Sequence, residues 1–410
     1  MTAAGALGEE IEVCVPVIDL CVPPPPPVAD IVEPVDVPAV EPEDAGAPAC
    51  PGFAPPDEDA CCAACNPSNP LCQANRCYGG WYCNLGTCKC KPPPDGCGAS
   101  EPPDAGPAID VSPPPDVAPP PGKCPLASGS GGAVTASGGT LDRLAFAVVG
   151  DTRPAIPDDT EGYPTAVIQG IWKAVQAEDP RPPFAVATGD YVYATTWGAE
   201  MAPQLGLYLG ARAAFQNPVF FAVGNHECNG LTKSNCGEGT KNGLTSNYEA
   251  YLAKMVTPLG KEAPWYSIPL SATDGSWTAK IVLVAANAWT DAQAAWLETA
   301  LSVPTTYTFV IRHEDNEATK APGTVPSSEL IYKHPLTLLI VGHTHTYEHH
   351  PEQREVIVGT GGAPLSGFKP YGYAVARQRT DCAIEFTTYG YAKHDVVHSF
   401  AILPDGSPAP

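Results

Sequence analysis

Buried-strand patterns alternate with amphipathic helical patterns over the second half of the chain. Short apolar runs such as Leu144–Val149 and Leu336–Val341 are typical of strands covered on both faces. Between such runs, apolar residues recur at helical spacing in Pro164–Glu178, Gln204–Phe215 and Asp291–Leu301. This alternation predicts an α/β fold with a largely parallel sheet and an antiparallel finish. The predicted strands are Leu144–Val149, Phe184–Ala187, Val219–Val223, Lys280–Ala285, Tyr307–Ile311, Leu336–Val341, Glu355–Val358, Gly372–Ala376, Ala383–Thr388 and Val396–Ala401.

The first third of the chain lacks both periodicities and is rich in proline. Residues 1–48 form an acidic, proline-rich segment that favours extended polyproline backbone and has too little apolar surface to fold alone, so we expect it to be disordered. Residues 98–140 repeat this composition with added glycine and are predicted to be a linker. The catalytic domain is then expected over 141–404.

Between these two segments, residues 49–97 hold ten cysteines and few large apolar side chains. This density is typical of a small disulfide module from an oxidising compartment. A zinc module is the alternative, since Cys62 and Cys65, or Cys88 and Cys90, have thiolate-ligand spacing, but the module contains no histidine. Thirteen of the 16 cysteines precede residue 125, an odd number, so one of them needs a partner outside this region. Cys228 and Cys236 are expected to form a disulfide that closes a short loop. Cys382 is then the candidate outside partner.

Charge and cysteine content restrict partners and location. The 410-residue chain has a formal charge of −23, which argues against a nucleic-acid polymer, and it has no apolar run long enough to span a membrane. The cysteines predict a secreted, cell-surface or periplasmic protein. No signal peptide is visible in Met1–Ile11, so we expect a leader missing upstream or a misplaced start.

Metal-ligand side chains follow the predicted strands. Five strands each end in aspartate, asparagine or histidine, and ligands bind at the carboxyl ends of strands in open α/β sheets. A single Gly-Asp or Gly-Asn pair is usually only a turn, but five such endings in one domain favour a metal site. The motifs are Gly150-Asp151, Gly189-Asp190-Tyr191-Val192-Tyr193, Gly224-Asn225-His226-Glu227, Val310-Ile311-Arg312-His313 and Gly342-His343-Thr344-His345-Thr346-Tyr347-Glu348.

In this order, the motifs resemble the calcineurin-like metallophosphoesterases, and within them the purple acid phosphatases most closely. The resemblance runs from about Ala145 to Gly362. It implies a four-layer α-β-β-α sandwich with two sheets face to face and helices outside.

The resemblance also implies two metal ions bridged by Asp190. One ion would be held by Asp151, Tyr193 and His345 with Asp190, and the other by Asn225, His313 and His343 with Asp190. Oxygen and imidazole ligands suit iron with iron, zinc or manganese. His226 would contact the substrate oxyanion or protonate the leaving group.

Arg153 and Tyr193 determine the subgroup. Most of the wider family has a histidine ligand where this chain has Arg153, and an arginine cannot replace it because it stays protonated. Tyr193 supplies the ligand that purple acid phosphatases use. Arg153, where those enzymes usually have glycine, either clamps the substrate phosphate or displaces the first metal; we favour the clamp.

The expected activity is hydrolysis of phosphomonoesters by a metal-bound hydroxide, with His226 and Arg153 as catalytic residues. Two alternatives stay open. One is a phosphodiesterase acting on small diesters. The other is a surface adhesion or binding protein, in which the Cys-rich module contacts a surface or another protein and the phosphoesterase fold has lost activity. Substrate specificity is expected to depend on the loops 229–247 and 314–325.

Overall fold

The computed structural model describes residues 82–84, 89–91, 131–196, 199–367 and 369–410. The chain divides into two units, Met1–Asp104 and Ala105–Pro410. In the first unit, β1 (Tyr82–Asn84) pairs antiparallel with β2 (Lys89–Lys91). The predicted acidic segment over 1–48, and the rest of the predicted Cys-rich module, lie outside the described residues.

The second unit contains two mixed sheets. The eight-stranded sheet has the order β12-β13-β11-β10-β9-β8-β4-β3, and β9, β10, β11 and β13 run parallel in it. Its strands are β3 (Gly132–Thr135), β4 (Gly138–Leu141), β8 (Tyr266–Ala272), β9 (Thr278–Leu283), β10 (Tyr307–Ile311), β11 (Leu338–Val341), β12 (Tyr347–His350) and β13 (Glu355–Val358).

The six-stranded sheet has the order β16-β15-β14-β5-β6-β7. Its parallel part joins β5, β6 and β7, and its antiparallel part adds the C-terminal strands beside β5. The strands are β5 (Ala145–Val149), β6 (Ala185–Ala187), β7 (Val219–Phe221), β14 (Gly372–Gln378), β15 (Ile384–Gly390) and β16 (Asp395–Ile402).

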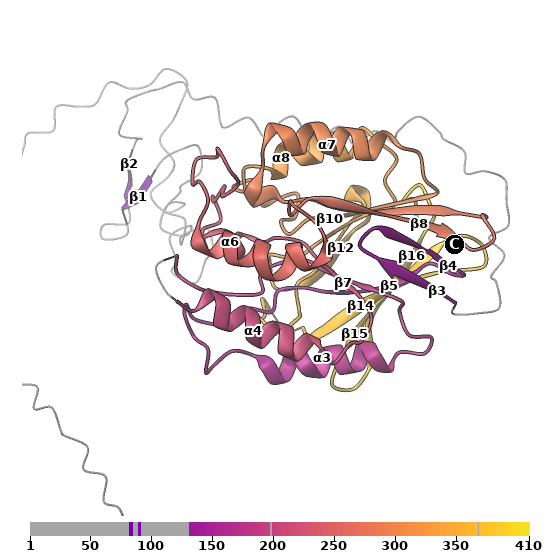
Figure 1. Ribbon diagram of the computed structural model, residues 1–410, viewed down its shortest axis with the longest axis horizontal. Helices are drawn as coiled ribbons and strands as arrows, with labels where there is room; N and C mark the ends of the chain where they lie inside the picture. Colours follow the sequence, from indigo (N-terminus) through magenta and orange to yellow (C-terminus); the bar gives the residue numbers. More distant parts are fainter. Residues whose placement is uncertain (1–81, 85–88, 92–130, 197–198, 368) are drawn as a thin grey trace, which may run out of the picture. The chain divides into compact units, whose positions relative to one another are not determined.

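Helices cover the outer faces of both sheets (Figure 1). The α-helices are α3 (Thr165–Ala177), α4 (Met201–Arg212), α5 (Asn225–Cys228), α6 (Ser246–Tyr251), α7 (Asp291–Ser302) and α8 (Thr324–Ile331). Shorter or irregular helical segments are η2 (Leu252–Val256), η3 (Thr257–Leu259), η4 (Ala286–Ala288) and η5 (Pro351–Gln353). No helix among the described residues is long and apolar enough to cross a membrane.

Three apolar cores hold the layers together. Side chains from both sheets, including Phe146, Phe184 and Phe309, form the central core. The helices α3, α4 and α6 bury a second core on the six-stranded sheet, and α7 and α8 bury a third on the eight-stranded sheet. In α3, Ile168, Ile171, Trp172 and Val175 are fully buried at helical spacing, which explains why this segment is a helix packed on a sheet.

The expected mixed α/β architecture is confirmed, with one boundary wrong. Residues 132–140, which the sequence placed in the linker over 98–140, form the hairpin β3–β4 together with Leu141, and β4 pairs with β8. This hairpin was not predicted because it consists of glycines and small residues, whereas a strand is recognised from its large apolar side chains. Strands β8 and β12 and helices α6 and α8 were also not predicted.

Candidate metal centre

The candidate ligands lie just beyond the carboxyl ends of parallel strands from both sheets. Asp151 follows β5, Asp190 follows β6, and Asn225 begins α5 after β7. In the other sheet, His313 follows β10, and His343 and His345 follow β11. Because parallel strands end at the same edge, residues far apart in the sequence converge here.

Four of these residues have left-handed backbone. The φ angles are 59° at Asp151, 55° at Asp190, 72° at His343 and 52° at His345. Such backbone costs a non-glycine residue about 1 kcal/mol or more and clusters at functional sites. The fold therefore holds these side chains in place at an energetic cost.

Glycines precede the ligands because the chains approach one another closely. A Cβ on Gly224 would lie 2.3 Å from Oδ1 of Asp190. A Cβ on Gly342 would lie 2.3 Å from Oδ2 of Asp151. Gly224 and Gly342 are therefore required because a side chain at either position would collide with the buried carboxylate of Asp190 or Asp151.

Asp151, Asp190 and His313 form a group that could hold a metal ion. One ligand atom from each lies within 4.8 Å of the other two, and all three residues are buried. Nε2 of His313 is 3.2 Å from Oδ1 of Asp190. Two buried carboxylates need nearby positive charge, so a cation suits this group.

Asn225 and His343 extend this group. Nδ1 of His343 lies 3.2 Å from Oδ1 of Asn225 and 3.2 Å from Nε2 of His313. Ligand atoms about 2.0–2.2 Å from one ion stand roughly 3–3.5 Å apart, which matches these separations. Asn225 and His343 therefore lie beside His313, and their role as ligands of one cation with Asp190 stays a prediction.

His345 lies beside Asp151. Nε2 of His345 is 3.6 Å from Oδ1 of Asp151, and its Nδ1 is 2.8 Å from the carbonyl oxygen of Pro364. Nδ1 of His313 is likewise 2.8 Å from the carbonyl oxygen of Thr188. Backbone carbonyls at Nδ1 orient both imidazoles so that Nε2 faces the site.

Arg153, Tyr193 and His226 pack together over Asp190. Nε of Arg153 and Nε2 of His226 each lie 3.7 Å from Oδ2 of Asp190. The Tyr193 ring packs edge-on against His226 at 4.4 Å, and the Arg153 guanidinium lies 4.8 Å from the centre of the same ring. These contacts put Tyr193 beside the site, and the ligand role of its hydroxyl stays a prediction.

Glu227 is a positioning residue that the sequence did not identify. Its buried carboxylate accepts hydrogen bonds from the backbone N–H groups of Asp190 (2.9 Å), Tyr191 (2.7 Å) and Gly224 (2.8 Å). It thereby fixes the two loops that carry Asp190 and Asn225. The Gly-Asn-His-Glu motif contains Glu227, but the sequence does not reveal that its carboxylate accepts hydrogen bonds from the backbone.

Burial and neighbouring charges shift the pKa values of the two site aspartates in opposite directions. Burial, reinforced by the charge of Asp190, raises the pKa of Asp151 to about 8. Burial also disfavours the ionised form of Asp190, but His226, His313 and Arg153 outweigh it and hold the Asp190 pKa well below its usual range. For His226, burial dominates and lowers the pKa to about 4. Asp190 is therefore the carboxylate that carries the negative charge of the site.

A disulfide closes the loop that follows His226. Cys228 and Cys236 are bonded, which confirms the predicted pair, and both are fully buried. Cys382 is also disulfide-bonded. The Cys228–Cys236 bond ties an interior residue of loop 229–247 to the end of α5.

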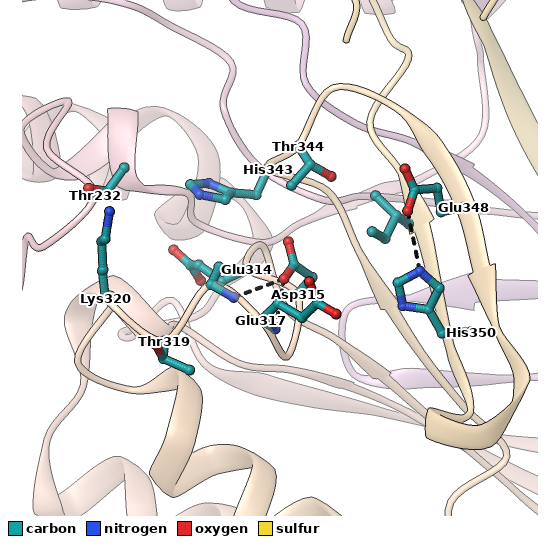
Figure 2. A pocket seen from close by; sticks show the side chains of 12 residues that line it. Thr232, Glu314, Asp315, Glu317, Thr319, Lys320, His343, Thr344, Glu348 and His350 are labelled. Carbon is teal, nitrogen blue, oxygen red and sulfur yellow. Dashed lines mark hydrogen bonds and ion pairs between the residues drawn. The ribbon is translucent and has the colours of Figure 1, made fainter. Parts of the chain in front are cut away.

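An open pocket of about 490 Å³ adjoins the candidate ligands (Figure 2). His343 belongs to both the ligand set and the pocket wall. The remaining wall comes largely from the loop that follows His313 and from β12. Its lining residues are Thr232, Glu314, Asp315, Glu317, Ala318, Thr319, Lys320, His343, Thr344, Glu348, His350 and Ile357.

Comparison with known proteins identifies the domain. Residues 144–347 match the family model described as calcineurin-like phosphoesterase. No curated protein matches the chain in sequence.

The chain is similar to several solved structures at low identity. One is GAP50, the anchor in the inner membrane complex of Plasmodium, at 14% identity and TM-score 0.44, covering 64% of this chain and 89% of that one. A purple acid phosphatase from yellow lupin (Lupinus luteus) has 16% identity and TM-score 0.43, covering 64% and 54%. A dimetal phosphatase from Danio rerio has 11% identity and TM-score 0.43, covering 64% and 99%. On the family match, residues 144–347 of this chain belong to the calcineurin-like phosphoesterases.

Proposed function

We propose that this protein is a metal-dependent phosphatase that hydrolyses phosphomonoesters. The observation that carries the proposal is the buried group of Asp151, Asp190 and His313, whose ligand atoms lie within 4.8 Å of one another at the ends of strands from both sheets. The family to which residues 144–347 belong supports phosphoester chemistry at this place.

The ligand sets follow from the donor atoms. Asp190, Asn225, His313 and His343 would hold one ion, and Asp151, Asp190, His345 and Tyr193 the other. Their oxygen and imidazole donors suit iron paired with iron, zinc or manganese. Two such ions, when bound, supply positive charge to the phosphoryl oxygens and make nearby water acidic.

Arg153 and His226 would bind the phosphate itself. Nε of Arg153 and Nδ1 of His226 are buried and have no hydrogen-bond partner among the described residues. Both side chains lie 3.7 Å from the Asp190 carboxylate, so they border the place where phosphate would sit. Arg153 would clamp two phosphate oxygens, and His226 would donate a proton to the leaving group.

We further propose that the protein is exported. The Cys228–Cys236 disulfide and the cysteine-rich segment over 49–97 support an oxidising compartment. The linker that begins at residue 98 would then separate the disulfide module from a catalytic domain that starts by residue 132.

The test compares hydrolysis of p-nitrophenyl phosphate by the wild-type protein and by Asp190→Asn, after loading with iron and zinc. Asparagine suits the left-handed backbone at this position, so folding should persist. Loss of the shared carboxylate should lower kcat by about 10³-fold or more. Asp274→Asn, at an exposed aspartate, is the matched control.

Equal rates for wild-type protein and Asp190→Asn would refute the proposal. Faster hydrolysis of bis(p-nitrophenyl) phosphate than of the monoester would instead favour a phosphodiesterase. Absence of turnover in a folded, metal-loaded wild-type protein would favour the binding-protein alternative.

A further inference from the structure

The pocket beside the candidate ligands contains buried carboxylates that lack partners. Glu314 is 1% exposed, and neither of its carboxylate oxygens has a hydrogen-bond partner among the described residues. Asp315 is 4% exposed; its Oδ1 accepts from the backbone N–H groups of Glu317 and Ala318, while its Oδ2 has no partner. Burying a carboxylate without a partner is costly, so these oxygens indicate a missing positive partner.

The fold keeps these carboxylates in the pocket wall. Arg312 is fully buried, and its Nε donates to the carbonyl oxygen of Glu314 at 2.7 Å. The rest of its guanidinium bonds to α8, at Ser327 and Ser328. Arg312 therefore anchors the loop by the backbone and makes no hydrogen bond to the Glu314 carboxylate.

Among the described residues, the other charged side chains of the pocket wall make no ion pair with Glu314 or Asp315. Figure 2 shows these two residues between Lys320 on one side and Glu348 with His350 on the other. Lys320 is exposed and makes no ion pair with a described carboxylate. His350 is already paired with Glu348 at 3.3 Å and Glu355 at 3.4 Å.

The pocket suits an organic cation better than a metal ion. Among the described residues, the only acid and histidine group gathered tightly enough for an ion is Asp151, Asp190 and His313. The pocket acids are not part of it. A volume of about 490 Å³ accommodates a small organic group that would bring its own hydrogen-bond donors.

We propose that this pocket binds the ammonium group of a substrate whose phosphate lies at the metal centre. The inference rests on the proposed phosphatase function and narrows it to phosphate esters of short amino alcohols. His343, which borders both regions, puts the two binding places side by side. Glu314 and Asp315 would accept charge-assisted hydrogen bonds from the ammonium group.

The test measures kcat/KM for 2-aminoethyl phosphate and for ethyl phosphate, which differ by the ammonium group. We expect the wild-type protein to prefer 2-aminoethyl phosphate by about tenfold or more. In Glu314→Gln and in Asp315→Asn, this ratio should fall to within about threefold of unity. Glu329→Gln, at an exposed residue of α8 that does not line the pocket, should keep the wild-type ratio.

The ratio also separates binding from misfolding, because a folding defect lowers both rates together. Equal kcat/KM for the two esters in the wild-type protein would overturn the inference and leave the phosphatase function standing. A preference that persists in both variants would overturn it as well. If neither ester is hydrolysed by protein that turns over p-nitrophenyl phosphate, the inference is overturned and the phosphatase function stands; if p-nitrophenyl phosphate is not hydrolysed either, both are overturned.

Discussion

At the scale of single residues, Arg153 distinguishes this site. Its guanidinium lies 3.7 Å from Asp190 and 4.8 Å from the centre of the Tyr193 ring. It therefore stands where it can contact both the shared carboxylate and a bound phosphate. An arginine is suited to the phosphate because its planar fork matches two oxygens at once.

Replacing Arg153 tests whether it is a phosphate clamp. In Arg153→Ala, kcat/KM for p-nitrophenyl phosphate should fall about 10- to 100-fold, the value of charge-assisted hydrogen bonds. Arg153→Lys should recover only part of this loss, because lysine keeps the charge without the fork. Steady-state kinetics, together with analysis of the bound metal, provide the measurement. If Arg153→His binds more metal than the wild-type protein and is more active, Arg153 instead displaces an ion.

The sequence could identify ligand types but not the residues that position them. Asp190, His313 and His343 were predicted as ligands because each follows a strand in a recognisable motif. The roles of Glu227 and Glu314 depend on the backbone groups and cavities that surround them. The spacing of residues along the sequence does not predict these surroundings. Similarly, whether Tyr193 reaches an ion depends on the ring contacts with His226 and Arg153.

At the scale of elements, Glu178 joins the end of α3 to β14. Its carboxylate accepts from the Tyr373 hydroxyl at 2.5 Å and from Arg377 at 2.6 Å, and it lies 2.8 Å from Nε2 of His394. Burial favours the neutral form of Glu178, but these hydrogen bonds outweigh it and lower its pKa below the ordinary 4.5. The ionised carboxylate therefore stabilises the fold.

The stability that Glu178 contributes should depend on pH. Because its pKa is lower in the folded state, its contribution is complete above about pH 4.5 and is lost as the pH falls through the lowered value. We expect Glu178→Gln to lower the free energy of unfolding by about 2 kcal/mol at pH 7 and by much less in acid. Urea unfolding at pH 7 and in acid measures this difference in the free energy of unfolding. An equal loss of stability at the two pH values would contradict the prediction. Glu329→Gln, at an exposed residue, serves as the control.

Most core elements were readable from the sequence because their apolar pattern is strong. Strand β10 was predicted at its observed bounds, and α3 ended within one residue of the prediction at each end. The hairpin β3–β4 was missed because its residues are small. Strand β8 was missed although its burial alternates, because Pro269 in its middle counts against a strand in the sequence. In both cases pairing with neighbouring strands outweighs a weak local preference.

At the scale of the whole molecule, the candidate metal centre combines residues that follow strands of both sheets. Asp151 and Asp190 come from the six-stranded sheet, and His313 and His343 from the eight-stranded sheet. A cation bound by both groups would bind the folded chain and not the unfolded one. Metal binding should therefore stabilise the entire domain.

Removing metal should lower the thermal stability of the full-length protein. At a free metal concentration of 100 times Kd, binding adds about 2.7 kcal/mol to the free energy of unfolding. Calorimetry should show a lower Tm after chelation and recovery on adding zinc or iron. In Asp190→Asn this recovery should be smaller; a Tm that does not respond to metal in the wild-type protein would contradict the proposed site.

The position of β5 at the centre of its sheet has a consequence for dissection of the chain. Asp151 follows this strand, and its partner on one side is β14, which lies beyond the segment that matches the family. A polypeptide truncated after residue 347 would keep every proposed ligand and still lose that partner. The apolar residues of β5 would then form an open, unpaired border prone to self-association. The minimal autonomous catalytic fragment must therefore extend through the C-terminal meander.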